Sequence, residues 1–246
     1  MKGKYEVDVK KNKVFVRRDT IMNEEVLYQM TVNGVCINYA VAGEGKPVIL
    51  VHGNGESHKA LSMQAEQLVN AGYKVYAPDS RGHGANEPLK EYHYIDMAED
   101  IFQFIRKVGL DKPAFYGHSD GGIIGLLLEI NHPGTLGVMA ISGTNLSPKG
   151  LSADFIKECA NEASDPLTEM MLNEPNIAPQ QLENIKIPVL VTAGEYDLIL
   201  REETDRIAEH LPYAKKIIVE GKNHGNYIID SSIMGELLLD FLSENY

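Results

Sequence analysis

Apolar and polar residues alternate with two different periods along the chain, and these periods predict most of its elements. Residues 5–10 and 14–17 alternate apolar and polar side chains around Lys11-Asn-Lys13, which predicts a small β-hairpin. Residues 19–30 lack this period and predict a helix or a linker. We expect this N-terminal extension, residues 1–30, to be a surface addition, with extension of the sheet and self-association as the alternatives.

From residue 31 onward, short apolar runs alternate with longer amphipathic segments. Runs of four to eleven residues predict strands, and the amphipathic segments predict helices. The predicted strands are 31–41, 47–51, 73–77, 113–116, 136–142, 187–193 and 216–219, and the predicted helices are about 58–71, 94–108 and 121–131. Strands that alternate with helices indicate βαβ units and therefore an α/β protein with a mostly parallel sheet.

The alternation of strands and helices is interrupted between residues 145 and 184. Prolines at 148, 166, 175 and 179 divide this stretch into one helix-like segment near 153–160 and another near 167–172. We therefore predict an insertion at 145–184 within a core made of residues 31–144 and 185–246.

Composition and charge limit the classes of protein that the chain could represent. A length of 246 residues with 43% hydrophobic residues suits one domain with a large core. The first ten residues contain no apolar run typical of a secretory signal, and no stretch of 18 apolar residues occurs, so we expect a cytoplasmic protein without membrane insertion. The formal charge of −12 argues against nucleic acid as a partner.

Candidate chemistry begins at Gly117-His-Ser-Asp-Gly121, which lies between a predicted strand and a predicted helix. A serine hydroxyl is a weak nucleophile unless a base lies beside it and a tight turn exposes its Oγ. Glycines on both sides of Ser119 permit a crowded backbone at such a turn. The pattern therefore predicts a nucleophile elbow centred on Ser119.

Other polar groups follow predicted strands in an order that suits this elbow. His52-Gly-Asn-Gly55 is a glycine-rich loop that can turn the N–H of Asn54 toward a developing oxyanion, and the N–H of Asp120 would be the second donor. Asp197 and His224 each follow a later predicted strand. Because catalytic groups gather at the carboxyl edge of a parallel sheet, we expect Ser119, Asp197 and His224 to meet there.

With these motifs in sequence order, residues 31–246 resemble the α/β-hydrolase superfamily. The matching segments are HGNG at 52–55, DSRGHG at 79–84, GHSDGG at 117–122, GEYD at 194–197 and KNHG at 222–225. The resemblance implies a triad in which Ser119 is the nucleophile, His224 the general base and acid, and Asp197 the residue that orients the imidazole. It also implies that the 145–184 insertion is a small helical cap over the active site.

Several residues are candidates for contact with a substrate. We predict that Phe155, Met170, Met171 and Tyr92 line the pocket, together with Ile156, Leu172 and Tyr94. Flexible Met side chains would suit varied acyl groups, although the same apolar residues could simply anchor the cap on the core.

The side chain of Asp120 has two interpretations. The elbow is similar to that of valacyclovir hydrolase-like enzymes, in which the corresponding aspartate binds the α-amino group of the substrate. The alternative, which we favour, is that the carboxylate forms hydrogen bonds to the turn or to neighbouring loops. We expect a structural role for the loop at 79–84 as well, since its glycines form a turn after a buried strand.

The sequence thus predicts a hydrolase of carboxylic esters of small or medium size that needs no metal or organic cofactor. Two alternatives stay open: the same triad could serve C–C or amide hydrolysis, perhydrolysis or acyl transfer, and the fold could instead serve as a ligand-binding receptor or signalling module. A small ester-like molecule is the expected partner, and assembly into a homo-oligomer stays open as an alternative to a monomer.

Overall fold

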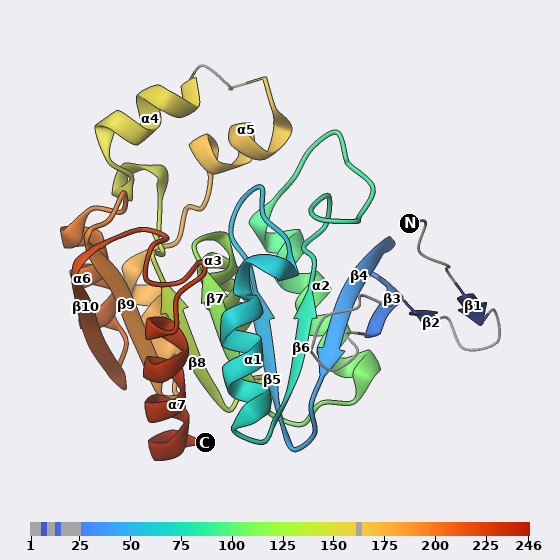
Figure 1. The fold of residues 1–246 in the computed structure, drawn as a ribbon. Coiled ribbons are helices and arrows are strands. Elements are labelled where there is room, and N and C mark those ends of the chain that lie inside the picture. Colours follow the sequence, from blue (N-terminus) through green and yellow to red (C-terminus); the bar gives the residue numbers. More distant parts are fainter. Residues whose placement is uncertain (1–5, 9–12, 16–25, 161–163) are drawn as a thin grey trace.

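The computed structural model describes residues 6–8, 13–15, 26–160 and 164–246 (Figure 1). The strands are β1 (Glu6–Asp8), β2 (Lys13–Phe15), β3 (Val26–Val32), β4 (Val35–Ala42), β5 (Lys46–Val51), β6 (Tyr73–Pro78), β7 (Ala114–His118), β8 (Val138–Ser142), β9 (Val189–Tyr196) and β10 (Ala214–Asn223). The helices are α1 (Ser62–Asn70), α2 (Tyr94–Val108), α3 (Asp120–Asn131), α4 (Ala153–Ala160), α5 (Pro166–Asn173), α6 (Arg201–His210) and α7 (Ile233–Asn245). Three short 3-10 helices cover His58–Leu61, Pro148–Gly150 and Pro179–Asn184.

Within these described ranges, ten strands form one sheet in the order β1-β2-β3-β4-β6-β5-β7-β8-β9-β10. The strands from β6 to β10 in this order run parallel to their neighbours, whereas β1 to β4 pair in antiparallel fashion and β4 joins β6. The α/β class and the mostly parallel sheet predicted from the sequence are confirmed.

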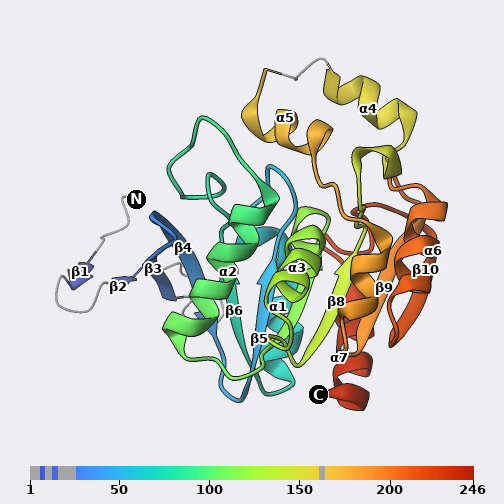
Figure 2. The same ribbon diagram turned by 180° about the vertical axis from the view of Figure 1, so that it is seen from behind.

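Helices cover both faces of this sheet, with α1 and α7 on one face and α2, α3 and α6 on the other (Figures 1 and 2). Successive residues of a strand point to opposite faces, so a strand buried on both sides is apolar throughout. In β5, Val48 and Leu50 pack with α1 and α7, whereas Ile49 and Val51 pack with α2 and α3. Two apolar layers therefore hold the central strands, and with them the loops at their carboxyl ends, in place.

The N-terminal extension confirms one prediction and corrects another. Strands β1 and β2 form the predicted hairpin, with Val7 opposite Val14, and β2 pairs with β3, so the hairpin extends the sheet. Residues 16–25 lie outside the described residues. The prediction of a helix or a linker for residues 19–30 was wrong over 26–30, because Val26–Val32 is a strand. The predicted strand 31–41 is in fact divided by a turn at Asn33 and Gly34, whose positive φ angles of 43° and 80° suit a tight hairpin.

Residues 145–184, the predicted insertion, carry α4 and α5, which lie beyond the carboxyl ends of the central strands (Figures 1 and 2). Both helices occur where the sequence predicted them. No helix in the described ranges combines the length and apolar composition needed to cross a bilayer.

Candidate active site

Ser119 lies between β7 and α3 in a backbone conformation that is unusual for a residue with a side chain. Its φ is 53° and its ψ is −114°, and its N–H donates to the carbonyl of Ser142 at 2.7 Å. A Cβ at Gly117 would lie 2.2 Å from the carbonyl of Gly121, and a Cβ at Gly121 would lie 2.1 Å from the carbonyl oxygen of Val51. The two glycines therefore allow the close packing that holds Ser119 in a strained conformation.

His224 and Asp197, which directly follow β10 and β9, are joined by a short contact. The Nδ1 of His224 lies 2.7 Å from Oδ1 of Asp197. The carboxylate also accepts hydrogen bonds from the N–H groups of Gly194 and Ile199, at 3.1 and 3.0 Å. Burial alone would raise the pKa of Asp197, but the hydrogen bond and charge interaction with His224, with the two backbone donors, hold it below its ordinary value.

The arrangement around Asp197 fixes which nitrogen of His224 is available for proton transfer. A carboxylate accepts hydrogen bonds, so Nδ1 of His224 carries the proton that it donates to Asp197, and Nε2 is left as the basic nitrogen. Gly143, with a φ of 57°, packs against the ring, where a Cβ would lie 2.6 Å from Cε1 of His224. A hydrogen bond to Asp197 and close packing against the backbone of Gly143 therefore hold the imidazole in place.

A cavity of about 180 Å³ brings the candidate residues together. Ser119, His224, Asn54 and Asp120 line it, although their loops follow three different strands and are far apart in sequence. The remaining lining residues are Gly53, Glu56, His118, Asn145, Leu151, Phe155, Met171 and Leu198. Ser119, His224, Asn54 and Asp120 thus border one small space, and Asp197 contacts it only through His224.

Asn54 and Asp120, the two predicted oxyanion donors, are linked through their side chains. The Nδ2 of Asn54 donates to Oδ2 of Asp120 at 3.0 Å. Asp120 is the first residue of α3, so its N–H belongs to the four at the helix start that no carbonyl of that helix accepts. The dipole of α3 adds partial positive charge at the same place.

The second carboxylate oxygen of Asp120 also accepts a hydrogen bond from a side chain of the protein. Its Oδ1 accepts a hydrogen bond from the hydroxyl of Tyr94 at 2.7 Å, and its residue is only 4% exposed. Burial raises the pKa of Asp120, and the hydrogen bonds from Tyr94 and Asn54 offset part of that rise. The contacts agree with the interpretation in which this side chain binds neighbouring loops, and each carboxylate oxygen already has a protein donor.

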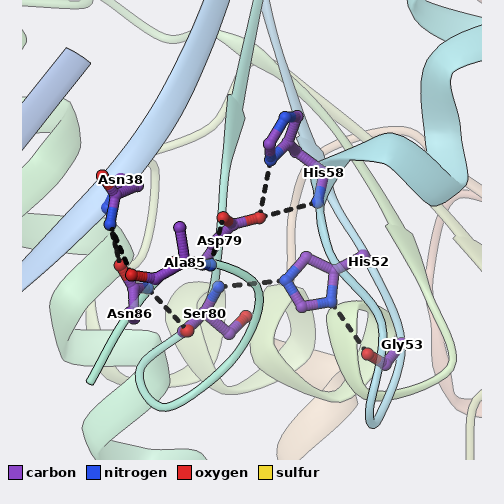
Figure 3. Close-up of polar contacts among 8 residues, drawn as sticks. All are labelled: Asn38, His52, Gly53, His58, Asp79, Ser80, Ala85 and Asn86. Atoms are coloured by element: carbon purple, nitrogen blue, oxygen red, sulfur yellow. Dashed lines mark hydrogen bonds and ion pairs between the residues drawn. The ribbon is translucent and has the colours of Figure 1, made fainter. Parts of the chain in front are cut away.

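A buried polar network lies behind the glycine-rich loop at 52–55 (Figure 3). Asp79 accepts hydrogen bonds from the N–H and Nδ1 of His58, both at 2.7 Å, and from the N–H of Ala85 at 3.2 Å. The side chain of Asn86 donates to the carbonyls of Asp79 and Ser80 and accepts from the N–H of Asn38. These contacts give the 79–84 segment the structural surroundings expected from its sequence.

His52 connects this network to the loop that carries Asn54 (Figure 3). Its Nε2 accepts from the N–H of Ser80 at 3.0 Å, and its Nδ1 lies 2.8 Å from the carbonyl of Gly53. Burial lowers the pKa of His52 to about 4, so the ring is neutral near pH 7. One tautomer, with the proton on Nδ1, satisfies both contacts and fixes the start of the loop.

The structure separates the predicted substrate-contact residues into two groups. Phe155 and Met171 line the cavity. Met170 and Tyr92 do not: both are buried in the core, and the hydroxyl of Tyr92 accepts from the N–H of Leu89. Neighbouring residues of a helix point about 100° apart, so one methionine of the pair faces the cavity and the other faces the core. The prediction was therefore wrong for Met170 and Tyr92, and Ile156, Leu172 and Tyr94 are also absent from the cavity lining.

The 145–184 insertion contacts the core next to the cavity. Glu174 accepts from the N–H of Tyr94 at 3.1 Å, and its other oxygen lies 2.6 Å from Nδ1 of His93. Nδ2 of Asn54 also approaches the carbonyl of Leu167 at 3.4 Å. The insertion is therefore anchored to the start of α2 and to the loop that carries Asn54.

Four cavity residues that lie outside the sequence motifs were missed by the sequence analysis: Glu56, Asn145, Leu151 and Leu198. Glu56 stands one residue beyond the HGNG segment, and its carboxylate next to a glycine-rich loop is a signal that could have drawn attention to it. The other three lie in irregular segments, where periodicity says nothing about side-chain direction. In the described ranges, no cluster of three His, Cys, Asp or Glu side chains is arranged to hold a metal ion.

Comparisons with known proteins bear on the fold. Residues 46–158 match the family model for the alpha/beta hydrolase fold. Bifunctional epoxide hydrolase 2 of Sus scrofa is 29% identical over 162 residues, which cover 63% of this chain but only 28% of that protein. Serine hydrolase BPHL of Mus musculus is 24% identical over 250 residues, which cover 87% of this chain and 85% of that protein.

Solved structures extend the likeness in fold to most of the chain. An esterase from Exiguobacterium antarcticum superposes with a TM-score of 0.77 at 18% identity, covering 87% of this chain and 98% of that one. Identity at this level shows the shared fold. Taken with the family match and the strand order, it shows that the chain has the alpha/beta hydrolase fold.

Proposed function

We propose that this protein is a serine hydrolase that cleaves carboxylic esters with small acyl groups through an acyl-enzyme on Ser119. The observation that carries the proposal is that strained Ser119 borders the same cavity as His224, whose Nδ1 is bound by Asp197. This is the constellation that activates a hydroxyl for attack on a carbonyl carbon.

The chemistry follows from where charge develops. Nε2 of His224 takes the proton of Ser119 Oγ as Oγ bonds to the ester carbonyl carbon, and the carbonyl electron pair moves to oxygen. The N–H groups of Asn54 and Asp120 receive this oxyanion; one such donor is typically worth about 2.7–4 kcal/mol. When the tetrahedral intermediate collapses, the C–O bond to the alcohol breaks and the alkoxide takes the proton from Nε2.

Water then completes the cycle by the same route. Nε2 of His224 accepts a proton from water as its oxygen attacks the acyl carbon, and Oγ of Ser119 leaves with that proton. Asp197 stays ionised throughout, because its three hydrogen-bond donors and its depressed pKa favour the carboxylate. Its part is to orient the imidazole and to stabilise the imidazolium.

The size and lining of the cavity support small substrates. At about 180 Å³ it is smaller than a typical drug-sized ligand site of roughly 300–1,000 Å³. Leu151, Phe155, Met171 and Leu198 give it an apolar part, while Lys and Arg are missing from its described lining. We propose that the 145–184 insertion acts as a cap that limits the length of the acyl chain. The names of the esterase and serine hydrolase relatives are consistent with this chemistry.

Initial rates on p-nitrophenyl acetate, butyrate, octanoate and palmitate test the proposal, with the wild type compared with Ser119→Ala. We expect the two short esters to be cleaved fastest and Ser119→Ala to lose the activity. Labelling by a fluorophosphonate, located by mass spectrometry, reports on nucleophilic Ser119 without depending on the acyl group. Ester cleavage that survives in Ser119→Ala overturns the proposal. A wild type that is labelled but cleaves no ester would redirect it to amide or C–C hydrolysis.

A further inference from the structure

His118 is a buried titratable residue that the proposed mechanism leaves unused. It is the last residue of β7, directly before Ser119, and is 3% exposed. Its Nε2 lies 3.3 Å from the carbonyl oxygen of His224, and its Nδ1 lies 3.5 Å from Oε2 of Glu56. Its Nε2 therefore faces an oxygen acceptor, and its buried Nδ1, which makes no hydrogen bond, lies next to the carboxylate of Glu56.

The form of the ring decides how many of the two acceptors it can serve. A neutral imidazole donates from one nitrogen and presents a lone pair on the other, so one of the two oxygens would face a lone pair. Only the imidazolium donates toward both the carbonyl of His224 and the carboxylate of Glu56. At 3.5 Å the contact with Glu56 is longer than a normal hydrogen bond but is within the range of an ion pair.

Glu56 is fixed from its other side by the loop that carries Asn54. Its Oε2 accepts from the N–H of Gly53 at 2.9 Å, and its own N–H donates to the carbonyl of Gly53. Burial would raise the pKa of Glu56, but the interactions with His118 and the N–H of Gly53 lower it below its ordinary value. A Cβ at Gly53 would lie 3.2 Å from Cβ of Ser119, so this loop and the elbow pack with little free space.

We propose that Glu56 and His118 are positioning residues whose ion pair holds the oxyanion loop and the His224 loop at one spacing from Ser119. Through Glu56 the pair sets the position of Asn54, and through the carbonyl of His224 it sets the position of the base. The inference deepens the proposed function and rests on it.

The expected consequence is a loss of rate with little loss of substrate binding. The oxyanion and the moving proton exist only in the transition state, so a small shift of Asn54 or His224 lowers kcat and leaves KM nearly unchanged. A displacement of 1 Å can cost roughly 100-fold in rate. We expect a loss of about tenfold or more, because removal of the ion pair loosens both loops at once.

The first test uses Glu56→Gln, which keeps an oxygen for the N–H of Gly53 but removes the charge. The matched control is Glu66→Gln, at an exposed position on α1. With p-nitrophenyl acetate we expect the first variant to lose kcat at near-constant KM and the control to match the wild type. A change confined to KM would mean that Glu56 contacts the substrate directly and would overturn the positioning role.

Two replacements of His118 separate its contacts. The amide of His118→Asn can donate near the place of Nδ1, toward Glu56, and that of His118→Gln near the place of Nε2, toward His224. We expect both to lower kcat. Adding Glu56→Gln to His118→Gln should cost little more, because that background has already lost the ion pair. Fully additive losses would show that the two residues act independently and would overturn the inference.

Fluorophosphonate labelling distinguishes failure of this inference from failure of the proposed function. A wild type that is neither labelled nor active on esters would overturn both. A wild type that is labelled rapidly, with Glu56→Gln and His118→Gln labelled at the same rate, would overturn the inference alone. Melting temperatures identify a variant that has simply unfolded. Glu56→Gln is the variant least expected to unfold, because the side chain of Glu56 is 26% exposed.

Discussion

The side chain of Asn54 donates a hydrogen bond to that of Asp120 at 3.0 Å, which joins the two residues whose N–H groups we assign to the oxyanion hole. The other oxygen of Asp120 accepts from Tyr94 at 2.7 Å. Loss of either donor would leave an oxygen of a buried carboxylate unsatisfied, which is costly. The separation of the two oxyanion donors therefore depends on side chains that need not touch the substrate.

Tyr94→Phe removes one of these donors and nothing else. We expect the free energy of unfolding to fall by about 1.5–3 kcal/mol, the value of a hydrogen bond to a charged group, and kcat to fall as Asp120 shifts. Urea denaturation and ester kinetics measure the two effects. Tyr213→Phe, at a side chain that is largely exposed, is the control. Unchanged stability in Tyr94→Phe would show that the hydrogen bond contributes nothing.

Asp197→Asn tests the orientation of His224. An amide at this position favours the wrong tautomer of the imidazole, and we expect kcat on p-nitrophenyl acetate to fall by about 10⁴-fold. Asp205→Asn is the control, because Asp205 pairs with Arg201 and Lys216 away from the cavity. An Asp197→Asn variant that retained full activity would remove Asp197 from the triad.

The neighbouring residues Met170 and Met171 provide an internal control for the acyl pocket. Met171 lines the cavity, so Met171→Ala should enlarge it and move the optimum toward longer p-nitrophenyl esters. Met170 is buried in the core, so Met170→Ala should cost about 2–5 kcal/mol of stability without moving that optimum. If both variants shifted the optimum equally, the assignment of their directions would be wrong.

Gly121→Ala tests whether the elbow requires a residue without a side chain at position 121. The new Cβ would lie 2.1 Å from the carbonyl oxygen of Val51, and overpacking of this kind costs about 1–3 kcal/mol or more. Gly225→Ala is the control, because its Cβ would meet only an ordinary contact at 3.7 Å. Thermal melting of both variants gives the comparison, and equal melting temperatures would contradict the crowding argument.

The lowered pKa of Asp79 leads us to expect that the free energy of unfolding depends on pH. Hydrogen bonds and the charge interaction with His58, with a backbone donor from Ala85, outweigh burial and hold its pKa below the ordinary 3.8. The folded protein thus favours the carboxylate, and this stabilisation is present in full above about pH 3.8 and lost as pH falls through the lower folded-state value. We expect Asp79→Asn to be clearly less stable than the wild type at pH 7, with a smaller gap at pH 3. Urea denaturation at both pH values measures the gap; a gap that widens in acid would reverse the sign.

Much of the fold could be predicted from the sequence because its signals are local. The amphipathic period over 94–108 gave α2 with the bounds that the structure has, and the apolar run at 47–51 gave all but the first residue of β5. Strand β3 was missed because its residues become a strand by pairing with β4, from Val26 opposite Val41 to Val32 opposite Val35. A strand's stability comes largely from such cross-strand neighbours, which a local period does not contain.

The sequence by itself determined the order of the chemical groups: a serine between glycines, a glycine-rich loop before it, and an aspartate and a histidine after later strands. Turn chemistry and strand periods depend on near neighbours, so these features can be recognised locally. Only the tertiary structure decided that Met171 and not Met170 borders the cavity, that Tyr94 binds Asp120, and that His118 lies between Glu56 and His224. The physical reason is that these contacts join segments far apart in sequence, and the packing of the sheet and its loops sets which side chains meet.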